Sequence, residues 1–367
     1  MPEPIRLLDE HGTRHASDEW DPWIQDVDDA ALAALYEDMV VVRRIDTEAT
    51  ALQRQGELAL WPPLLGQEAA QIGSGRALRA DDFVFSSYRE NAVAYCRGVG
   101  ILDLVRVWRG LTASAWNPFD VGMAAPQVII GAQSLHATGY ALAIQNDEER
   151  EGRSGDSAVA VAYFGDGAMS EGDVGEAFVF ASTFQAPVVF FCQNNQYAIS
   201  EPVRVQTHVP LVDRPGGYGI PAVQVDGNDV LAVMAVTRQA LDRARTGGGP
   251  SFIEAVTYRM GPHTTADDPT RYRDPAELEV WGARDPISRL RTYLEQRGAA
   301  GSELEARAAE AADGVARELR AGISGLEDPP PLDVFAHVYA EPHPGVDRQR
   351  DAYARYLEGF AQEGPAL

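Results

Sequence analysis

Cysteine is scarce in this 367-residue sequence, which contains only Cys96 and Cys192. Two thiols cannot build the disulfide framework of a small secreted domain. No apolar run reaches the roughly 18 residues of a membrane-spanning helix, and the segment Met1–Arg6 lacks a basic stretch followed by an apolar core. We therefore expect a cytoplasmic protein without a membrane span.

Basic residues are also few, because 31 Lys and Arg oppose 55 Asp and Glu, for a formal net charge of −24. Nucleic-acid binding requires clustered basic side chains that contact phosphates, so this charge balance argues against it. Hydrophobic residues make up 45% of the chain, which is enough for a sizeable core. Length alone permits one large or two medium domains.

A strand–helix–strand pattern spans the middle of the chain. Residues 158–164 and 188–192 are apolar runs, and between them apolar side chains recur at helical spacing. A right-handed crossover makes the two strands parallel and near neighbours. Their carboxyl ends then face one crevice, which is where open α/β sheets bind ligands.

Other stretches complete an α/β pattern. Apolar spacing predicts further helices over 29–52, 133–145 and 230–245, and strands over 222–225 and 252–256. Long irregular stretches inside compact domains are often functional, and three are present, at 112–130, 201–221 and 259–274. From residue 285 the chain is predicted to be helical to about residue 320, with a proline-rich break at 328–332 before a short final helix.

The crevice carries metal-binding and phosphate-binding residue types. Asp166 follows the first strand and Asn195 the second, and both offer hard oxygen ligands of the kind Mg²⁺ prefers. Gly165 and Gly167 let the backbone approach a phosphate, and the next helix would point its N–H groups at that anion. A chance Gly-Asp-Gly turn is the alternative, but it does not explain the paired Asn194–Asn195. The pattern predicts a metal–diphosphate site.

The pattern resembles the thiamine diphosphate signature, and the chain resembles the alpha subunit of the branched-chain 2-oxo acid dehydrogenase decarboxylase component. The resemblance runs from about Leu32 to Leu294 and more weakly to the C-terminus. It is carried by six ordered stretches: Arg54–Gly56, Phe85–Glu90, Ser170–Asp173, Asn194–Ser200, Val225–Asp229 and Tyr258–Asp268. It implies the thiamine diphosphate-binding α/β fold, a mostly parallel sheet flanked by helices. We expect an N-terminal arm (1–28), the cofactor-binding domain (29–284) and a C-terminal helical extension packed on the same domain (285–367).

The resemblance also assigns residues to the cofactor. It gives Mg²⁺ to Asp166, Asn195 and the backbone carbonyl of Tyr197. The residues implied to contact thiamine diphosphate are Tyr88, Arg89, Val128, Ile130, Gly165, Gly167, Ala168, Gln193 and His263. Ile130 would hold the cofactor in its folded conformation, and the backbone of Val128 would accept from its aminopyrimidine.

Two positions depart from the animal relatives, which have Arg at the position of Gln193 and Thr at the position of Ala132. With the first change, one phosphate charge contact is either missing or supplied by another residue. The second removes a ligand of a monovalent-cation site, although Gln133 is retained, so the resemblance leaves K⁺ open.

His263 is the predicted catalytic residue, because it lies in the stretch that matches the family's active-site loop. A lone loop histidine is more often a solvated bystander, but here the flanking residues match as well. An imidazole can exchange protons near neutral pH and hydrogen bond an intermediate. We expect His263 to orient the acyl group for transfer to lipoamide, and Arg259 to organise the loop.

The resemblance implies oxidative decarboxylation of branched-chain 2-oxo acids, such as 3-methyl-2-oxobutanoate, with acyl transfer to lipoamide. The implied substrate pocket contains Leu60, Trp61, Ser87 and Ile130. The expected partners are a beta subunit in an α₂β₂ heterotetramer, which supplies the activating carboxylate, and the lipoyl domain of an acyltransferase core.

Alternatives at this point are a pyruvate or acetoin dehydrogenase alpha subunit, a non-catalytic assembly subunit that keeps the fold, and a generic Mg²⁺-dependent phosphate-binding protein. In a further reading, Leu60 and Ser87 are ordinary packing residues and the beta subunit sets specificity.

Overall fold

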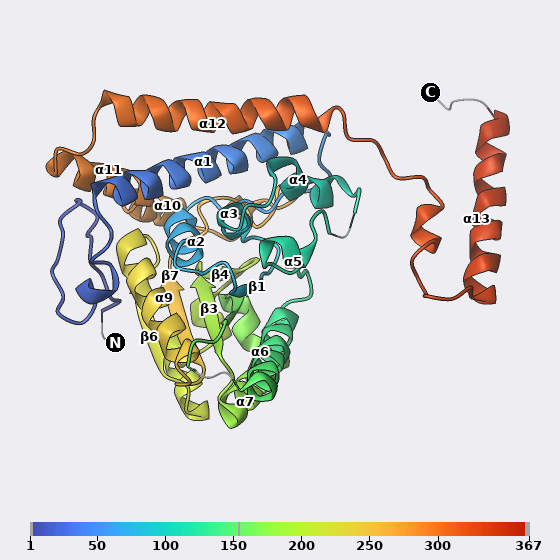
Figure 1. Cartoon of the computed structure of the whole chain (residues 1–367). Coiled ribbons are helices and arrows are strands. Elements are labelled where there is room, and N and C mark those ends of the chain that lie inside the picture. The colour runs from blue at the N-terminus through green and yellow to red at the C-terminus, as the bar shows by residue number, and fades with distance from the viewer. Residues whose placement is uncertain (1–2, 113, 153–154, 364–367) are drawn as a thin grey trace. The chain divides into compact units, whose positions relative to one another are not determined.

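A five-stranded parallel sheet forms the centre of the computed structural model, which describes residues 3–112, 114–152 and 155–363 (Figure 1). Neighbouring strands pair in parallel throughout. In spatial order they are β1 (Phe83–Phe85), β2 (Ala160–Gly165), β3 (Val188–Asn194), β7 (Ser251–Val256) and β6 (Ala222–Asp226). The predicted α/β class with a mostly parallel, helix-flanked sheet is confirmed.

Strands β2 and β3 are direct neighbours, as the central pattern predicts. Their register pairs Gly165 with Gln193, so the two strands end side by side. All of β3 is buried, which explains why its sequence is a continuous apolar run rather than an alternation of apolar and polar residues. Asp166 and Asn195 therefore leave the sheet at the same edge.

Helices cover the sheet. Helices α6 (Ala132–Glu151) and α7 (Gly172–Phe184) share a buried apolar cluster with alternate residues of β2 and β3, among them Ala162, Phe164 and Phe190. The intervening residues point to the opposite face. Helix α9 (Val230–Arg245), predicted over the same residues, packs along β6 and β7 and against α2 (Glu68–Gly75).

A pair of long helices, α1 (Asp29–Arg54) and α12 (Ser302–Ile323), lies side by side over this core (Figure 1). The Asp28 carboxylate accepts from the Ala31 N–H at 2.9 Å and caps α1. Arg320 of α12 forms a salt bridge with the buried Glu48 of α1. Both helices belong to the compact unit that contains the sheet.

The N-terminal arm is fixed to the sheet edge. Ile5 forms a parallel bridge with Val225 of β6, and the buried Asp229 carboxylate accepts from the N–H groups of Leu7 and Leu8, both at 2.6 Å. The arm therefore contributes buried residues to the core.

The remaining elements are shorter or lie near the chain end. They are α3 (Asn91–Cys96), α4 (Ile101–Arg109), α5 (Pro118–Val121), β4 (Tyr197–Ala198), β5 (Glu201–Pro202), α8 (Val203–Gln206), α10 (Pro275–Gly282), α11 (Pro286–Gln296) and α13 (Pro344–Glu363). The final helix was expected to be short, but α13 has 20 residues. Within the described part of the chain, no helix has the length and apolar character needed to span a membrane.

Two compact units are present, Met1–Ser324 and Gly325–Leu367. The first contains the sheet and α1–α12, and the second contains α13, where Phe335 packs against Tyr353 with ring centroids 6.0 Å apart. The division into parts at residues 28 and 284 stays a prediction; its outermost residues, 1–2 and 364–367, lie outside the described residues, as does residue 113 of the irregular stretch 112–130.

Candidate active site

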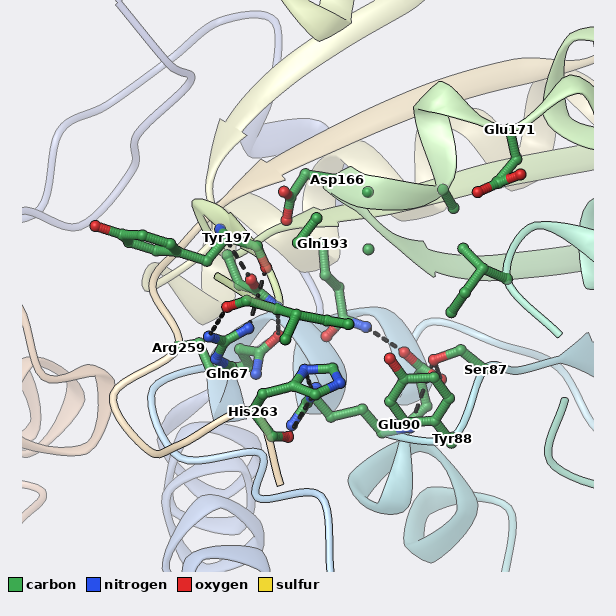
Figure 2. Close-up of a pocket in the computed structure, with 18 of the residues that line it drawn as sticks. Gln67, Ser87, Tyr88, Glu90, Asp166, Glu171, Gln193, Tyr197, Arg259 and His263 are labelled. Carbon is green, nitrogen blue, oxygen red and sulfur yellow. Dashed lines mark hydrogen bonds between the residues drawn. The ribbon is translucent and has the colours of Figure 1, made fainter. Parts of the chain in front are cut away.

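A cavity of about 230 Å³ opens at the carboxyl ends of β2 and β3. Four segments distant in sequence converge on it, residues 87–90, 165–168, 193–199 and 259–263 (Figure 2). This is the crevice that the strand–helix–strand pattern predicts as a ligand site.

Most of the predicted site residues line this cavity, namely Ser87, Tyr88, Arg89, Ile130, Gly165, Asp166, Gly167, Ala168, Gln193, Asn195, Tyr197 and His263. Leu60, Trp61 and Val128 are not part of the wall. The indole of Trp61 is fully buried, and its Nε1–H donates to the buried Asp46 carboxylate at 2.7 Å. The structure thus does not bring Trp61 to the cavity that holds Ser87 and Ile130.

Three oxygen atoms meet at the predicted metal position. One terminal atom of the Asn195 amide lies 3.3 Å from Asp166 Oδ1 and 3.1 Å from the Tyr197 carbonyl oxygen. If the amide were turned over, a nitrogen would occupy this position and could donate to both oxygens. The structure places the amide oxygen there, while the amide nitrogen donates to Gln67 Oε1 at 3.3 Å.

This spacing fits a small divalent cation. Neighbouring ligands of an octahedral Mg²⁺ at about 2.1 Å lie about 3.0 Å apart, close to the spacing at Asn195. One carboxylate and two neutral oxygens also leave coordination positions for phosphate and water. Among the described residues there is no group of three or more His, Cys, Asp or Glu that could hold a metal, so any metal here depends on this mixed oxygen set.

The backbone beside these oxygens passes close to the opposite wall of the cavity at Gly167. A Cβ atom on Gly167 would lie only 2.7 Å from the Cβ of Ala198, so a side chain at this position would collide with the opposite wall. The sequence predicts a helix directly after Gly167. Instead Asp166–Ser170 forms a 3-10 turn, and α7 begins at Gly172, because Glu171 has an extended backbone.

Two buried arginines supply positive charge. The chain contains no lysine, so the permanent cations of its side chains are all guanidinium groups. Arg259 is 1% exposed and donates to the carbonyl oxygens of Tyr197 at 3.1 Å and Ile199 at 2.6 Å. Its buried Nε–H has no acceptor among the described residues, which leaves a donor suited to an anionic ligand.

Arg89 holds the catalytic candidate. Its guanidinium donates to the carbonyl oxygens of Pro63 at 2.6 Å and His263 at 2.9 Å, and lies 3.2 Å from His263 Nδ1. Burial, Arg89 and Arg259 together lower the pKa of His263 to about 3. The imidazole is therefore neutral at pH 7. With Nδ1 facing a cation, the proton belongs on Nε2.

Comparison with known proteins identifies the family. The model of the family described as "Dehydrogenase E1 component" matches residues 36–319. The chain belongs to the dehydrogenase E1 component family. This membership implies thiamine diphosphate as the cofactor, and it agrees with a cavity that offers oxygen ligands and buried guanidinium groups.

Curated relatives cover most of this E1 chain. A 3-methyl-2-oxobutanoate dehydrogenase subunit alpha of Mycobacterium tuberculosis is 47% identical over 351 residues, which is 95% of this chain and 93% of the relative. A pyruvate dehydrogenase E1 component subunit alpha of Staphylococcus aureus is 41% identical over 298 residues, or 81% and 78% of the two chains. The corresponding Staphylococcus epidermidis protein is 40% identical over 328 residues, or 89% and 85%.

The E1 cavity also contains residues that sequence reasoning missed. Glu90 is buried in the wall, where its carboxylate accepts from Ser87 Oγ at 2.8 Å and Gln193 Nε2 at 2.6 Å. Burial raises the pKa of Glu90. Gln193 in turn accepts from Gln71 Nε2 at 3.1 Å. Gln193, which occupies the position of an Arg in the animal relatives, is thus an uncharged side chain that connects the buried Glu90 to Gln71 of α2. The only sequence signal for Glu90 was its place beside Tyr88 and Arg89.

Proposed function

We propose that this chain is the alpha subunit of a thiamine diphosphate-dependent 2-oxo acid dehydrogenase that acts on branched-chain 2-oxo acids such as 3-methyl-2-oxobutanoate. The observation that carries the proposal is the three-oxygen cluster of Asp166, Asn195 and Tyr197 in a cavity that also contains His263. The M. tuberculosis relative, 47% identical over 95% of the chain, supports the branched-chain substrate.

In the proposed holoenzyme, Asp166, Asn195 and the Tyr197 carbonyl would hold Mg²⁺, whose charge would offset that of the cofactor's diphosphate. When bound, thiamine diphosphate supplies the electron sink for loss of carbon dioxide from a 2-oxo acid. The buried guanidinium groups of Arg89 and Arg259 would offset the charge of a diphosphate in this cavity. The wall residues that would contact the cofactor are those predicted above: Tyr88, Ile130, Gly165, Gly167, Ala168 and Gln193. We leave K⁺ out of the proposal, because Ala132 has no side-chain oxygen.

His263 would donate from Nε2–H to an oxygen atom of the substrate. The Arg89 contacts fix the imidazole so that Nδ1 faces the guanidinium and Nε2 is free to face the cavity. A neutral imidazole donates without adding a cation that would pair with the diphosphate. Ser87 and Ile130 would bound the substrate's side chain, with Ile130 supplying an apolar surface.

The proposal includes two partners. A beta subunit would supply the carboxylate that activates the aminopyrimidine, in an α₂β₂ assembly, and a lipoyl domain of an acyltransferase core would accept the acyl group. The relatives from M. tuberculosis and S. aureus are both called alpha subunits. The S. aureus name favours pyruvate as the second candidate substrate.

A co-expression experiment tests the function. The chain is purified with its beta subunit and by itself, and both samples are assayed on a 2-oxo acid panel with an artificial electron acceptor. We expect decarboxylation only with the beta subunit and none in Asp166→Ala, with unchanged activity in the exposed control Asp147→Ala. Robust turnover by the isolated chain would refute the partner proposal, and cofactor affinity unchanged in Asp166→Ala would refute the site.

A further inference from the structure

The second carboxylate oxygen of Asp166 is held by a residue outside the cavity wall. Asp166 Oδ1 faces the Asn195 amide, whereas Oδ2 accepts from Gln206 Nε2 at 2.9 Å. Among the described residues, Gln206 is the only side chain that donates to this carboxylate. Asp166 itself is 1% exposed, so its orientation depends on the few groups around it.

Gln206 is fixed in place by its own backbone surroundings. Its Nε2 also donates to the Glu201 carbonyl oxygen at 2.9 Å, so each hydrogen of the amide has an acceptor. The two acceptors are both oxygens, and they determine which end of the amide faces Asp166.

The segment that carries Gln206 is the return of a small hairpin. Strands β4 and β5 pair antiparallel, with Tyr197 opposite Pro202, and Val203 N–H donates to the Gln196 carbonyl oxygen at 3.0 Å. One side of the hairpin presents the Tyr197 carbonyl to the three-oxygen cluster. The other side leads into α8, whose last residue is Gln206.

We infer that Gln206 is a positioning residue for the metal site. Its side chain holds the Asp166 carboxylate so that Oδ1 stays directed at the three-oxygen cluster. This rests on the proposed function of the cluster. A neutral amide suits the task, because it satisfies Oδ2 without the positive charge that would compete with the metal for the carboxylate. Partners that orient metal ligands in this way typically contribute about 10- to 100-fold in metal affinity.

Metal titration of the α/β complex tests the inference. Mn²⁺ serves as the probe, and the free-ion electron paramagnetic resonance signal gives its Kd in the presence of thiamine diphosphate. Gln206→Met keeps the side-chain length but removes both N–H donors, and Gln206→Leu serves as a second variant should the first not fold. The control is His208→Ala, two residues along the same segment and exposed.

We expect Gln206→Met to weaken Mn²⁺ binding about 10- to 100-fold and His208→Ala to leave it unchanged. The Mg²⁺ concentration for half-maximal activity should rise by a similar factor, while kcat at saturating Mg²⁺ returns close to the parent value. A Kd within twofold of the parent, together with loss of binding in Asp166→Ala, would overturn the role of Gln206 and leave the metal site intact. Unchanged binding in Asp166→Ala would overturn both.

Discussion

The guanidinium of Arg89 lies 3.2 Å from Nδ1 of His263 and donates to the carbonyl oxygen of the same residue at 2.9 Å. One arginine thus fixes both the backbone and the ring of the catalytic candidate. His263 is also held at its N–H, which donates to Asp267 Oδ2 at 2.9 Å. Arg89 therefore contributes both to the position of the loop and, after burial and together with Arg259, to the lowered pKa of His263.

The first prediction concerns the protonation of His263. Its pKa falls from 6.5 to about 3, so the unfolded chain binds this proton more tightly than the folded chain. His263 therefore lowers the free energy of unfolding as the pH drops from about 6.5 towards about 3, and it has no such effect above pH 7. Arg89→Met should raise the pKa of His263, which the imidazole resonances in an NMR titration would report. An unchanged pKa in that variant would refute the electrostatic role of Arg89.

A second prediction concerns the hydrogen bonds that Asp46 accepts from residues 61–65. The buried Asp46 carboxylate accepts from Trp61 Nε1 at 2.7 Å and from the N–H groups of Leu64 at 3.0 Å and Leu65 at 3.1 Å. Asp46→Ala leaves these donors without an acceptor, at a cost of about 1–3 kcal/mol for each buried donor that finds no water. We expect a Tm lower by several degrees in thermal unfolding. The exposed Asp29→Ala should change the Tm little, and equal effects of both variants would contradict the role of Asp46.

Substrate choice gives a third prediction. Each additional methylene buried in an apolar pocket is worth roughly 1 kcal/mol or somewhat more, so branched acids should exceed pyruvate by roughly ten- to a thousandfold in kcat/KM. Ser87 directs its hydroxyl to Glu90, and Ile130 offers the apolar contact, so Ile130→Ala should reduce this ratio. Steady-state kinetics on the α/β complex measures the ratio of kcat/KM for the branched acids to that for pyruvate. Pyruvate equal or better would favour the pyruvate dehydrogenase alternative. If Ile130→Ala leaves this ratio unchanged, the beta subunit determines the substrate specificity.

Regulation gives the fourth prediction. Animal relatives are inactivated by phosphorylation of a serine directly after the loop histidine and of another ten residues later, positions that correspond to Thr264 and Asp274. The Asp274 carboxylate accepts from the Ala276 N–H at 2.9 Å and caps α10. We expect no two-site switch, and a loss of about 1 kcal/mol of stability in Asp274→Ala. Asp274→Ser should keep most of the cap. Inactivating phosphorylation of Thr264, detected in cells by mass spectrometry, would argue against this.

The sequence alone was sufficient for the parallel pair β2 and β3 and for the edge where Asp166 and Asn195 meet. Buried strands and helices repeat their apolar residues at fixed spacings, and the crossover rule orients the strands, so local patterns determine these elements. The α/β fold class and the family followed from the same motifs.

Only the tertiary structure decided which polar side chains complete the cavity. Glu90 meets Gln193 across 103 positions, and Gln206 meets Asp166 across 40. It also decided that Trp61, predicted for the substrate pocket, turns its indole to Asp46. Side-chain hydrogen bonds between distant segments depend on the packing of whole elements, which no local spacing encodes. The motifs therefore determined where the site lies, and packing determined which residues hold its ligands in position.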